Sequence, residues 1–409
     1  MKYLFLLFFP AFTLHAQFLW QVYPDTIIKW NYTDGDEFNK NEINKDKWTT
    51  SFPWTITVPS QEAVIRENNI KFNNGIASFI VDKDSSLVKL NDWQIDTLRF
   101  KKLGIKLLAG NKMPVKYSLG LLWSNKTYKY GYFEIKFKAC DGKGLWPAFW
   151  MYAANKNNEI DFLELKGEKE KYLHVDIHCP DGCGNYKKNL FGVGQKWGHW
   201  LKTEQRLKSS YNVMAGEWTP TFIKYYLNGK LVAYVEHAYD MGMHLIVGNG
   251  IAKDGAPFKP GPDKATPFPN PFFVDYVRIY KTDTLPNLTI IKENLALTKF
   301  ISNEADTSSF VSDKANKKLI NNRNNNLKSK NVLTISIMPL SKSSMSFRAI
   351  GLANGDTLVA TFKNSNGDLI KYLEVKKNSE TVISFTEGSS IDFQLTINEK
   401  IIKENLTIR

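Results

Sequence analysis

Short runs in which apolar and polar residues alternate recur along most of the chain. Residues 75–81 and 132–137 are two examples, rich in β-branched and aromatic residues, and this period of two is typical of half-buried strands. Residues 222–235 contain two such runs joined by an Asn-Gly pair, which favours a type I′ hairpin because both turn positions need positive φ. We find no long amphipathic helix. The pattern therefore predicts an all-β fold, with residues 17–283 forming one antiparallel β-sandwich.

The distribution of Trp divides the chain. All 11 Trp lie in the first 218 residues, and residues 281–409 contain none. A stretch rich in Asn, Lys and Ser follows the Trp-rich part, a composition typical of linkers. Alternating runs then return, again with an Asn-Gly pair between two of them. We predict a linker at 284–331 and a small second β domain at 332–409.

The first 16 residues have the pattern of a secretory signal peptide. Lys2 precedes an apolar run, and Leu14-His15-Ala16 resembles a small-residue cleavage site. The run is interrupted by Pro10 and is shorter than the ~20 apolar residues that a membrane span needs. We therefore expect export, a secreted or cell-surface location, and no membrane span.

The chain has three cysteines. Cys179 and Cys183 could close a small loop as a disulfide in an oxidising compartment, which would leave Cys140 free. A zinc site that combines these two cysteines with His174 and His178 is the alternative. Because neighbouring residues of a strand point to opposite faces, His178 and Cys179 would be poor ligands of one metal.

The net charge is +13, from 54 Lys and Arg against 41 Asp and Glu. No dense basic run with interleaved aromatics is present, so we do not expect a nucleic-acid partner. The excess is either an ordinary solvated basic surface or a preference for an anionic polysaccharide or cell surface.

The candidate chemistry lies in a run of six residues, Glu159-Ile160-Asp161-Phe162-Leu163-Glu164. Alternation places Glu159 and Asp161 on one face of a strand, but Glu164 falls on the other face because the side-chain period is two. A one-residue β-bulge near Leu163 would bring all three acids to one face, and bulges are common beside active sites. The carboxyl groups of Glu159 and Glu164 could then approach the ~5–5.5 Å that is typical of retaining glycosidases.

This pairing suits the hydrolysis of a glycosidic bond. One carboxylate attacks the anomeric carbon, while the other, protonated, donates to the leaving oxygen and later activates water. Three acids on one face cannot all ionise cheaply, so at least one pKa should rise. The alternative interpretation is an exposed acidic strand without a catalytic role.

The segments on either side of the acidic run supply candidates for substrate binding. His174, Asp176 and His178 alternate on one polar face of the next strand, and they could line the same cleft if that strand pairs with the acidic one. Trp146 is a candidate platform for a sugar ring, because a flat apolar face matches the C–H face of a pyranose. Trp150 is expected in the core.

At these residues the sequence resembles glycoside hydrolase family 16, in its laminarinase-like branch with a bulged E-x-D-x-x-E motif. The resemblance covers about residues 28–281 and rests on five segments in order: DEFN at 36–39 with Trp48, YGYFEIKFKA and GLWPAFWM within 130–151, EIDFLE at 159–164, EWTP at 217–220 with YLNG at 226–229, and FFVDYVRIY at 272–280. It implies a concanavalin-like jelly-roll sandwich with a concave cleft, and endo-acting hydrolysis with retention. It further implies Glu159 as nucleophile, Asp161 as its electrostatic partner and Glu164 as acid/base, with no cofactor required for catalysis.

The sequence departs from the family pattern in two places. Laminarinase-like members often carry a further Trp-Pro segment before the nucleophile, and this segment is missing here. Many members also carry an Asn on the strand at 245–248; here that Asn is replaced, with Gly248 or its neighbour Asn249 at that place. The resemblance therefore favours a β-1,3- or mixed-linked β-glucan as substrate, with a marine galactan as runner-up. A non-catalytic, lectin-like polysaccharide-binding sandwich is the alternative of another class. Family members also often bind a structural calcium, and Glu37, Gly75 and Asp275 stand at matching positions.

The last strands of the tail are similar to C-terminal sorting domains of gliding-type bacteria. Such a domain would connect the chain to export machinery or to the cell surface. A carbohydrate-binding role is the competitor, which the absence of Trp from this segment weakens. We expect a monomer whose partner is a polysaccharide substrate.

Overall fold

The structure is a computed structural model, and it describes residues 18–22, 27–154, 157–179, 196–235, 239–283, 333–341, 344–352, 357–385, 390–397 and 400–407. The signal peptide expected at 1–16 and the linker expected at 284–331 lie outside these residues. The described residues form two compact units, one within Thr33–Lys330 and the other from Met1–Tyr32 together with Asn331–Arg409. Both units are built almost entirely from strands. Among the described residues, no helix is long and apolar enough to cross a bilayer.

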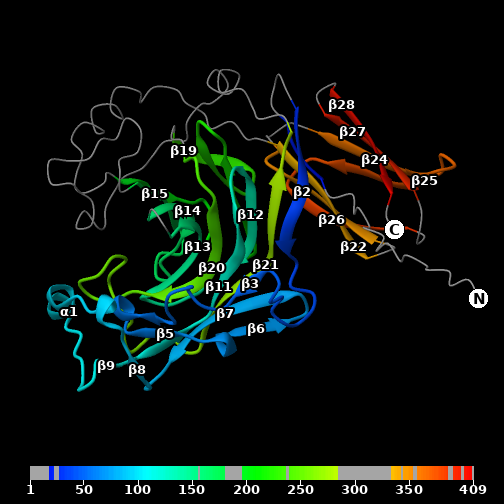
Figure 1. Cartoon of the computed structure of the whole chain (residues 1–409). Coiled ribbons are helices and arrows are strands. Elements are labelled where there is room, and N and C mark those ends of the chain that lie inside the picture. The colour runs from blue at the N-terminus through cyan, green and yellow to red at the C-terminus, as the bar shows by residue number, and fades with distance from the viewer. Residues whose placement is uncertain are drawn as a thin grey trace, which may run out of the picture. The chain divides into compact units, whose positions relative to one another are not determined.

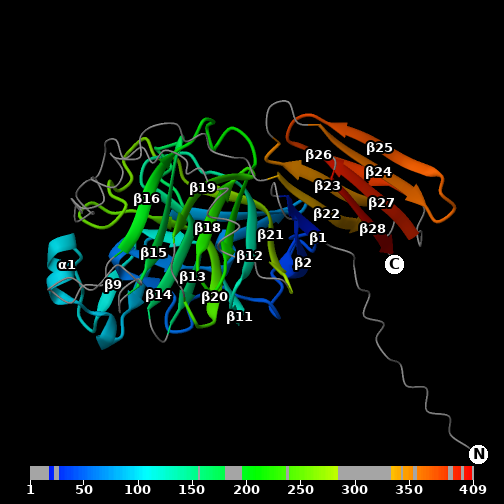
Figure 2. The same cartoon turned by 90° about the horizontal axis from the view of Figure 1, so that it is seen from above.

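The larger unit is a sandwich of two sheets, whose strands form two layers in Figures 1 and 2. One sheet, here called the cleft sheet, is antiparallel throughout. Its strands, in spatial order, are β16 (Lys196–Lys202), β15 (Tyr172–His178), β14 (Asn158–Glu164), β13 (Leu145–Ala153), β20 (Met243–Ile251), β11 (Leu121–Tyr128) and β3 (Trp48–Thr49).

The second sheet lies behind the cleft sheet. Its main strands, in spatial order, are β19 (Lys230–Val235), β18 (Ile223–Leu227), β17 (Asn212–Trp218), β12 (Gly131–Lys138), β21 (Asn270–Lys281) and β7 (Ile76–Lys83). Four short strands extend it beyond β7: β6 (Ile70–Asn73), β10 (Tyr117–Leu119), β5 (Ala63–Ile65) and β4 (Thr57–Val58). The expected hairpin joins β18 to β19, and both turn residues, Asn228 and Gly229, have positive φ.

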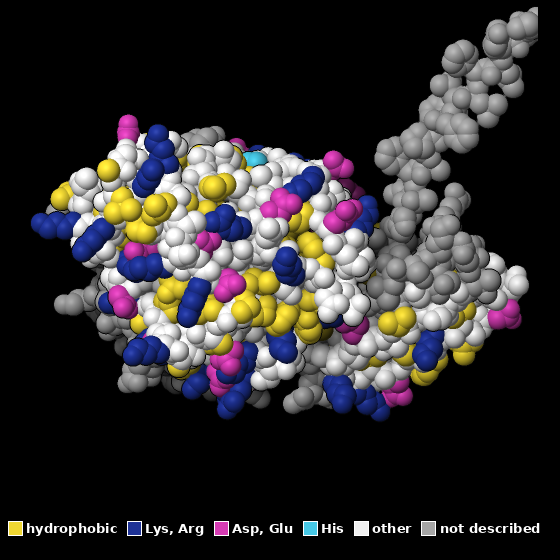
Figure 3. Space-filling model, turned by 90° about the horizontal axis from the view of Figure 1, so that it is seen from below, with side chains coloured by type: hydrophobic (Ala, Val, Ile, Leu, Met, Phe, Trp, Pro, Cys, Tyr) yellow, Lys and Arg dark blue, Asp and Glu magenta, His cyan; other side chains and the backbone are white. Residues whose placement is uncertain are grey.

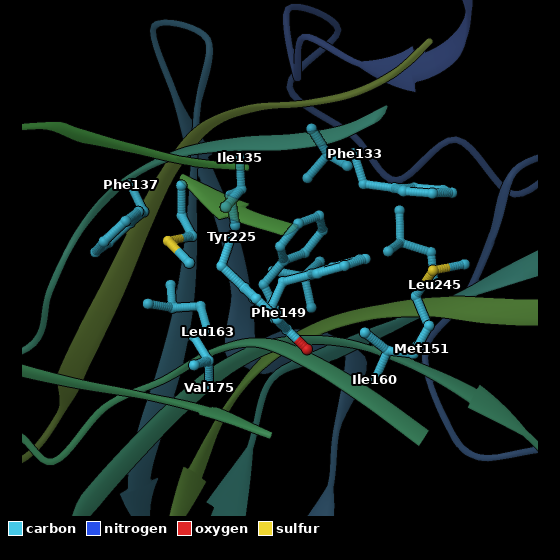
Figure 4. Close-up of a cluster of buried hydrophobic side chains, with 14 of the residues drawn as sticks. Phe133, Ile135, Phe137, Phe149, Met151, Ile160, Leu163, Val175, Tyr225 and Leu245 are labelled. Atoms are coloured by element: carbon cyan, nitrogen blue, oxygen red, sulfur yellow. The ribbon is translucent and has the colours of Figure 1, made fainter. Parts of the chain in front are cut away.

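The core of the larger unit fills the space between the two sheets, as Figure 4 shows. Strand β13 illustrates why the sequence folds this way, because every second residue is buried along its whole length. Phe149 and Met151 point into the core and are fully buried, while Trp146 and Trp150, at the alternate positions, are only partly buried. Period-two alternation thus builds an all-β sandwich of the jelly-roll type, which confirms the predicted fold class.

A small lobe interrupts the sandwich between β7 and β10. It comprises β8 (Leu87–Lys89), the 3₁₀ turn η3 (Asp92–Gln94), α1 (Thr97–Leu103) and β9 (Lys112–Pro114). Helix α1 begins at the N-cap Asp96, whose side chain accepts a hydrogen bond from the backbone N–H of Arg99, and it ends at Gly104 in the left-handed conformation. Buried apolar residues hold the lobe together, namely Val64, Leu90, Phe100, Leu103, Ile105, Met113 and Val115. We refer to residues 87–114 as the lobe.

The smaller unit is a second β-sandwich. One of its sheets contains β1 (Phe18–Val22), the start of β2 (Ile27–Asp36), β22 (Leu333–Ser341), β23 (Ser344–Ile350) and β26 (Ser379–Ser384). The other has the order β25 (Leu369–Val375), β24 (Leu358–Asn364), β27 (Ser390–Ile397) and β28 (Lys400–Thr407).

The smaller unit draws its first strand from the N-terminal part of the chain. Strand β1 pairs with β22 along its whole length, and Trp20 is buried in the same apolar cluster as Phe347 and Phe393. The sequence-based boundaries placed residues 17–32 in the larger domain. Counting Trp along the chain cannot detect this arrangement, because the pairing of β1 with β22 joins segments more than 300 residues apart.

Candidate active site

The acidic run forms strand β14, in the middle of the cleft sheet, and it contains the expected bulge. Opposite β13, Asp161 pairs with Trp150 and Glu164 pairs with Ala148, so three steps on β14 match two steps on β13. Opposite β15, Asp161 pairs with Asp176 and Glu164 pairs with His174, again with one extra residue on β14. The bulge between Asp161 and Glu164 is therefore confirmed from both neighbouring strands, and it brings Glu159, Asp161 and Glu164 to one face.

The extra residue is accommodated on the core side of β14. Phe162 and Leu163 are consecutive in the chain, yet both are fully buried in the core. The Phe162 ring stacks on Phe133, with centroids 5.5 Å apart, and it lies directly over Gly216 of β17, where an added Cβ would be 2.1 Å from the ring. A glycine at position 216 therefore leaves the space that the bulge requires.

Strand β15 adds two histidines and a fourth carboxylate to the same face. Its register places His178 opposite Glu159, Asp176 opposite Asp161 and His174 opposite Glu164. The pairing of β15 with the acidic strand is the condition that the sequence analysis set for a shared cleft, and the turn at 166–171 connects the two strands. The structure thus brings together all six residues that the sequence grouped as acids and polar neighbours.

His178 lies between two acids. Its Nε2 is 3.4 Å from Asp161 Oδ2 and 3.5 Å from Asp176 Oδ2. Gly198 on β16 faces Asp176, and an added Cβ there would lie 2.8 Å from its carboxyl carbon, so the missing side chain leaves room for this acid. Along β15 imidazole and carboxyl groups alternate, and Asp176 faces Asp161 across the two strands.

Asp161 is the acid whose protonation state is most strongly altered. Burial raises its pKa well above the usual value, and the charges of Glu159, Glu164 and Asp176 together with a hydrogen bond to Glu159 raise it further. This confirms the expectation that at least one pKa in the acidic group rises. A proton on Asp161 is thereby favoured, and it is positioned for donation to the carboxylate of Glu159.

Glu164 is held by two side chains. The indole Nε1 of Trp146 donates to Oε1 of Glu164 at 2.9 Å, and Nδ1 of His174 is 2.8 Å from Oε2. One face of the Trp146 ring is covered by Phe258, with centroids 4.3 Å apart and planes 6° apart. In this arrangement Trp146 orients an acid, a role that the sequence analysis did not assign to it.

An aromatic group surrounds this end of the site. Phe258 and Trp200 both contact the His174 ring, and the Lys166 ammonium lies 5.5 Å from the Trp200 centroid and 5.8 Å from that of Phe258. The sequence analysis missed Phe258 and Trp200. Phe258 lies in the proline-rich segment that precedes β21, where no periodicity indicates which way a side chain points.

A cavity of about 220 Å³ opens beside the three acids. Its lining includes Trp146, Trp150, Glu159, Asp161 and Glu164, together with a wall from Phe52, Val58, Gln61 and Ile65 and a glycine-rich segment at 248–250. Trp150 therefore lines the cavity, and its expected place in the core is wrong. The reason is register, since the residue that pairs with Asp161 must share its face.

The far end of β14 is held by Tyr239. Its hydroxyl shares one proton between the carbonyl oxygens of His178 and Glu159, at 2.9 and 3.2 Å, and lies 2.8 Å from Cys179 Sγ. Cys179 is disulfide-bonded, and Cys140 is a free, buried thiol. A disulfide at Cys179 removes its thiolate from the alternative zinc site; Cys183 lies outside the described residues.

The residues expected to bind calcium lie in adjacent segments, and the carboxylates among them are paired with cations in this arrangement. Arg278 donates to both carboxylate oxygens of Glu37, at 2.7 and 2.9 Å, and Lys136 pairs with Asp275 at 2.9 Å. The backbone at Gly75 lies near the Glu37 carbonyl, so the segments are adjacent as expected. Both carboxylates, however, already neutralise a cation, and a calcium site depends on their charge.

Comparison with known proteins assigns a family to this site. Residues 61–247 match the family model of glycosyl hydrolases family 16. This segment includes β14 with its bulge, β15 and most of the residues that line the cavity. Residues 61–247, just under half of the chain, therefore match glycoside hydrolase family 16, the family that the motifs predict.

Curated relatives agree with the family. A clotting factor G alpha subunit from Tachypleus tridentatus is 25% identical over 245 residues, which cover 52% of this chain and 33% of the relative. A beta-glucanase from Rhodothermus marinus is 28% identical over 178 residues, or 38% of this chain and 58% of the relative. The chain thus spans only about a third to three fifths of these relatives. Among solved structures, the laminarinase catalytic domain of Thermotoga maritima MSB8 has a TM-score of 0.50 at 18% identity, over 62% of this chain and 99% of that chain, a likeness of fold.

Proposed function

We propose that the larger unit is an endo-acting β-glycan hydrolase that works by double displacement with retention. The observation that carries the proposal is the bulge of β14, which brings Glu159, Asp161 and Glu164 to one face beside a cavity. A strand without the bulge would direct Glu164 into the core, and no acid pair could form.

Each acid has a separate task in this mechanism. Glu164 protonates the glycosidic oxygen as the bond to the anomeric carbon breaks, while the Glu159 carboxylate attacks that carbon to form a glycosyl-enzyme. Water, deprotonated by Glu164, then attacks the same carbon and releases Glu159 as a carboxylate. Asp161, whose proton is favoured, donates to Glu159 and keeps its attacking oxygen oriented.

Four neighbouring side chains contact the three acids, namely Trp146, His174, His178 and Asp176. Trp146 and His174 contact the two oxygens of Glu164 and fix its carboxyl plane. His178 lies within 3.5 Å of Asp161 and Asp176, and its imidazole lies beside these two acids without adding negative charge. The mechanism uses no cofactor.

For the substrate we propose a β-1,3- or mixed-linked β-glucan. The support is the names of relatives, which include a glucan endo-1,3-beta-glucosidase A1 from Niallia circulans at 24% identity over 60% of this chain and 37% of the relative. A galactan remains the second candidate, because the cavity wall and the glycine-rich segment at 248–250 have no assigned sugar contacts. Secretion is proposed as well, and the disulfide at Cys179 fits an oxidising compartment.

The test uses purified protein with laminarin, lichenan, agarose and carrageenan, and it measures reducing ends together with the anomer first released. We expect cleavage of a β-glucan with retention. Glu159→Ala and Glu164→Ala should each abolish hydrolysis while the melting temperature stays near that of the wild type. Cleavage of a galactan alone would replace the substrate, and binding without turnover would favour a lectin-like sandwich.

A chemical rescue separates the two acid roles. With an activated aryl glycoside and azide, Glu159→Ala should give a glycosyl azide of inverted configuration, because azide then replaces the nucleophile. Glu164→Ala should give the retained azide, since its glycosyl-enzyme still forms. Exchanged products would mean that the two assignments are reversed.

The smaller unit is proposed as an attachment or sorting module, and the chain as a monomer. Trp20, which belongs to this unit, is fully buried in its core and therefore offers no ring face to a sugar. Tyr372 on β25, 53% exposed, is then the large aromatic side chain that its described residues leave at the surface, and a surface with one such ring favours attachment over carbohydrate binding. Cell fractionation with and without residues 332–409 tests this role.

A further inference from the structure

The lobe carries a concentration of positive charge that the catalytic mechanism does not use. Residues 87–114 contain six Lys and Arg and only two Asp. All six cations are exposed, namely Lys89, Arg99, Lys101, Lys102, Lys106 and Lys112. Both acids already have partners, since Asp96 caps α1 and Asp92 accepts a hydrogen bond from Asn111.

None of these six cations forms an ion pair with a described residue. The cations that flank the lobe behave differently, because Arg66 pairs with Asp84 at 2.7 Å and Lys116 pairs with Glu62 at 2.9 Å. The lobe thus concentrates charge that no described acid neutralises, whereas Arg66 and Lys116 beside it are paired. Figure 3 shows Lys and Arg side chains spread among hydrophobic ones on the underside of the molecule.

Two of the lysines are placed where their charges oppose each other. Lys89 of β8 and Lys112 of β9 are direct cross-strand partners, while Val88 and Met113, on the other face of this two-stranded sheet, pack into the core of the lobe. Like charges directly opposite each other destabilise a sheet. Lys101 and Lys102 have an ordinary role at the C-terminal end of α1, where cations favour the helix dipole. No such role explains Lys89 and Lys112.

The segment that is hydrogen-bonded to this hairpin carries an exposed aromatic side chain. Trp93 is 63% exposed, and the segment that carries it is joined to the lysine hairpin by the hydrogen bond from Asn111 to Asp92 and by the backbone bond from Leu90 to Asn111. An exposed indole can stack on a sugar ring through its flat face. An exposed indole and exposed ammonium groups on hydrogen-bonded segments of one lobe suit a sugar chain that carries negative substituents.

The lobe is also attached to the wall of the active-site cavity. The Gln94 side chain, next to Trp93, donates to the hydroxyls of Thr55 and Thr57 at 2.9 and 2.6 Å. Thr57 opens β4, and the following residue, Val58, lines the cavity. A polysaccharide bound on the lobe would therefore be held close to the site of cleavage.

We propose that the lobe is a second, non-catalytic binding surface for an anionic polysaccharide, with Lys89 and Lys112 binding sulfate or carboxylate groups and Trp93 stacking on a sugar ring. Either kind of anionic group would relieve the repulsion between the two lysines. Binding at this surface does not depend on hydrolysis by Glu159 and Glu164, so the two proposals can fail separately.

The test compares the full-length wild type with Lys89→Gln/Lys112→Gln and with Trp93→Ala, by affinity electrophoresis and calorimetry. The probes are ι-carrageenan for sulfate, polygalacturonate for carboxylate, and laminarin as a neutral chain. We expect the lysine variant to bind the anionic chain roughly fivefold to tenfold more weakly at low salt, with a smaller salt dependence. Trp93→Ala should weaken binding while leaving the salt dependence unchanged.

The matched control is Lys40→Gln/Lys71→Gln, which removes the same charge from exposed positions outside the lobe. Equal weakening in this control would mean that net charge alone attracts the chain, and it would overturn the proposal. The proposal would also be overturned if both lobe variants bound as tightly as the wild type, or if the wild-type protein bound neither anionic probe. Preference for anionic phospholipid vesicles over both polysaccharides would assign the lobe to a membrane instead. Hydrolysis of a short soluble β-glucan should be unchanged in every variant.

Discussion

Replacing Gly216 with Ala tests whether the catalytic bulge depends on the packing behind it. Gly216 lies on β17, and an added Cβ would be 2.1 Å from both Cδ1 and Cε1 of Phe162. The best separation of two carbon atoms is about 3.5–4.0 Å, so the ring would have to retreat by about 1.4–1.9 Å. Phe162 stands between Asp161 and Glu164, and it cannot move that far without shifting the bulge.

The magnitude of the effect follows from this displacement. Overpacking a core of this kind costs about 1–3 kcal/mol, and a domain of this size loses about 2–4 °C of melting temperature per kcal/mol. A catalytic group misplaced by about 1 Å can cost on the order of 10²-fold in rate. We therefore expect the melting temperature of Gly216→Ala to fall by roughly 2–12 °C, and kcat to fall on the order of 10²-fold at temperatures where the variant is fully folded.

The assay combines thermal unfolding with kinetics on a soluble β-glucan. The control is Gly261→Ala, because an added Cβ there would meet its nearest atoms at 3.4 Å, an ordinary contact. Shortening the opposing ring, in Gly216→Ala/Phe162→Leu, should recover part of both losses, so the two changes should be non-additive by about 0.5–3 kcal/mol. Wild-type kcat in Gly216→Ala, or additive effects in the double variant, would refute the link between this glycine and the acids.

Three further changes probe the site. Trp146→Phe preserves the stack on Phe258 but removes the hydrogen bond to Glu164, worth about 1.5–3 kcal/mol, so kcat should fall at least about tenfold with little change in melting temperature; an unchanged kcat would contradict this role. Asp161→Asn should melt at a higher temperature than the wild type, by a margin that grows from about pH 4 to about pH 7. Because the pKa of Asp161 is raised in the native state, unfolding releases its proton, and the stability of the wild type therefore falls as the pH rises above ~3.9. A margin that does not depend on pH would refute this reasoning. A chelator should leave the melting temperature unchanged, because the carboxylates expected to bind calcium are paired with Arg and Lys; a fall on chelation would restore the calcium site.

Local pattern was sufficient to predict most of β14 and its neighbourhood. Alternation identified Glu159 and Asp161 as sharing a face, and the mismatch at Glu164 required one extra residue, which both neighbouring strands show. The same alternation grouped His174, Asp176 and His178 on β15. These predictions rest on the alternation of side chains within a strand, which is a local property of the backbone. Residues that pair across adjacent strands share a face for the same reason.

Trp150 shows where local pattern is insufficient. Its apolar character favoured the core, but facing is decided by register, and its pairing with Asp161 turns it toward the cavity. Phe258 shows a second limit, because it reaches Trp146 from a segment that has no period at all. Trp20 shows a third, since its core neighbours Phe347 and Phe393 lie more than 300 residues away in the chain.

These limits have a common physical cause that also explains how Glu164 is positioned. A burial preference is a property of one residue, whereas the orientation of Glu164 depends on Trp146 from β13 and His174 from β15, and Trp146 is in turn stacked against Phe258 from a loop. An exposed sugar platform requires a free ring face, but the Trp146 ring has one face against Phe258 and its N–H bonded to the acid. The indole that the sequence indicated as a substrate contact is therefore better suited to hold Glu164 in place, and Trp150 and Phe52 are the remaining aromatic side chains of the cavity lining on which a sugar ring could stack.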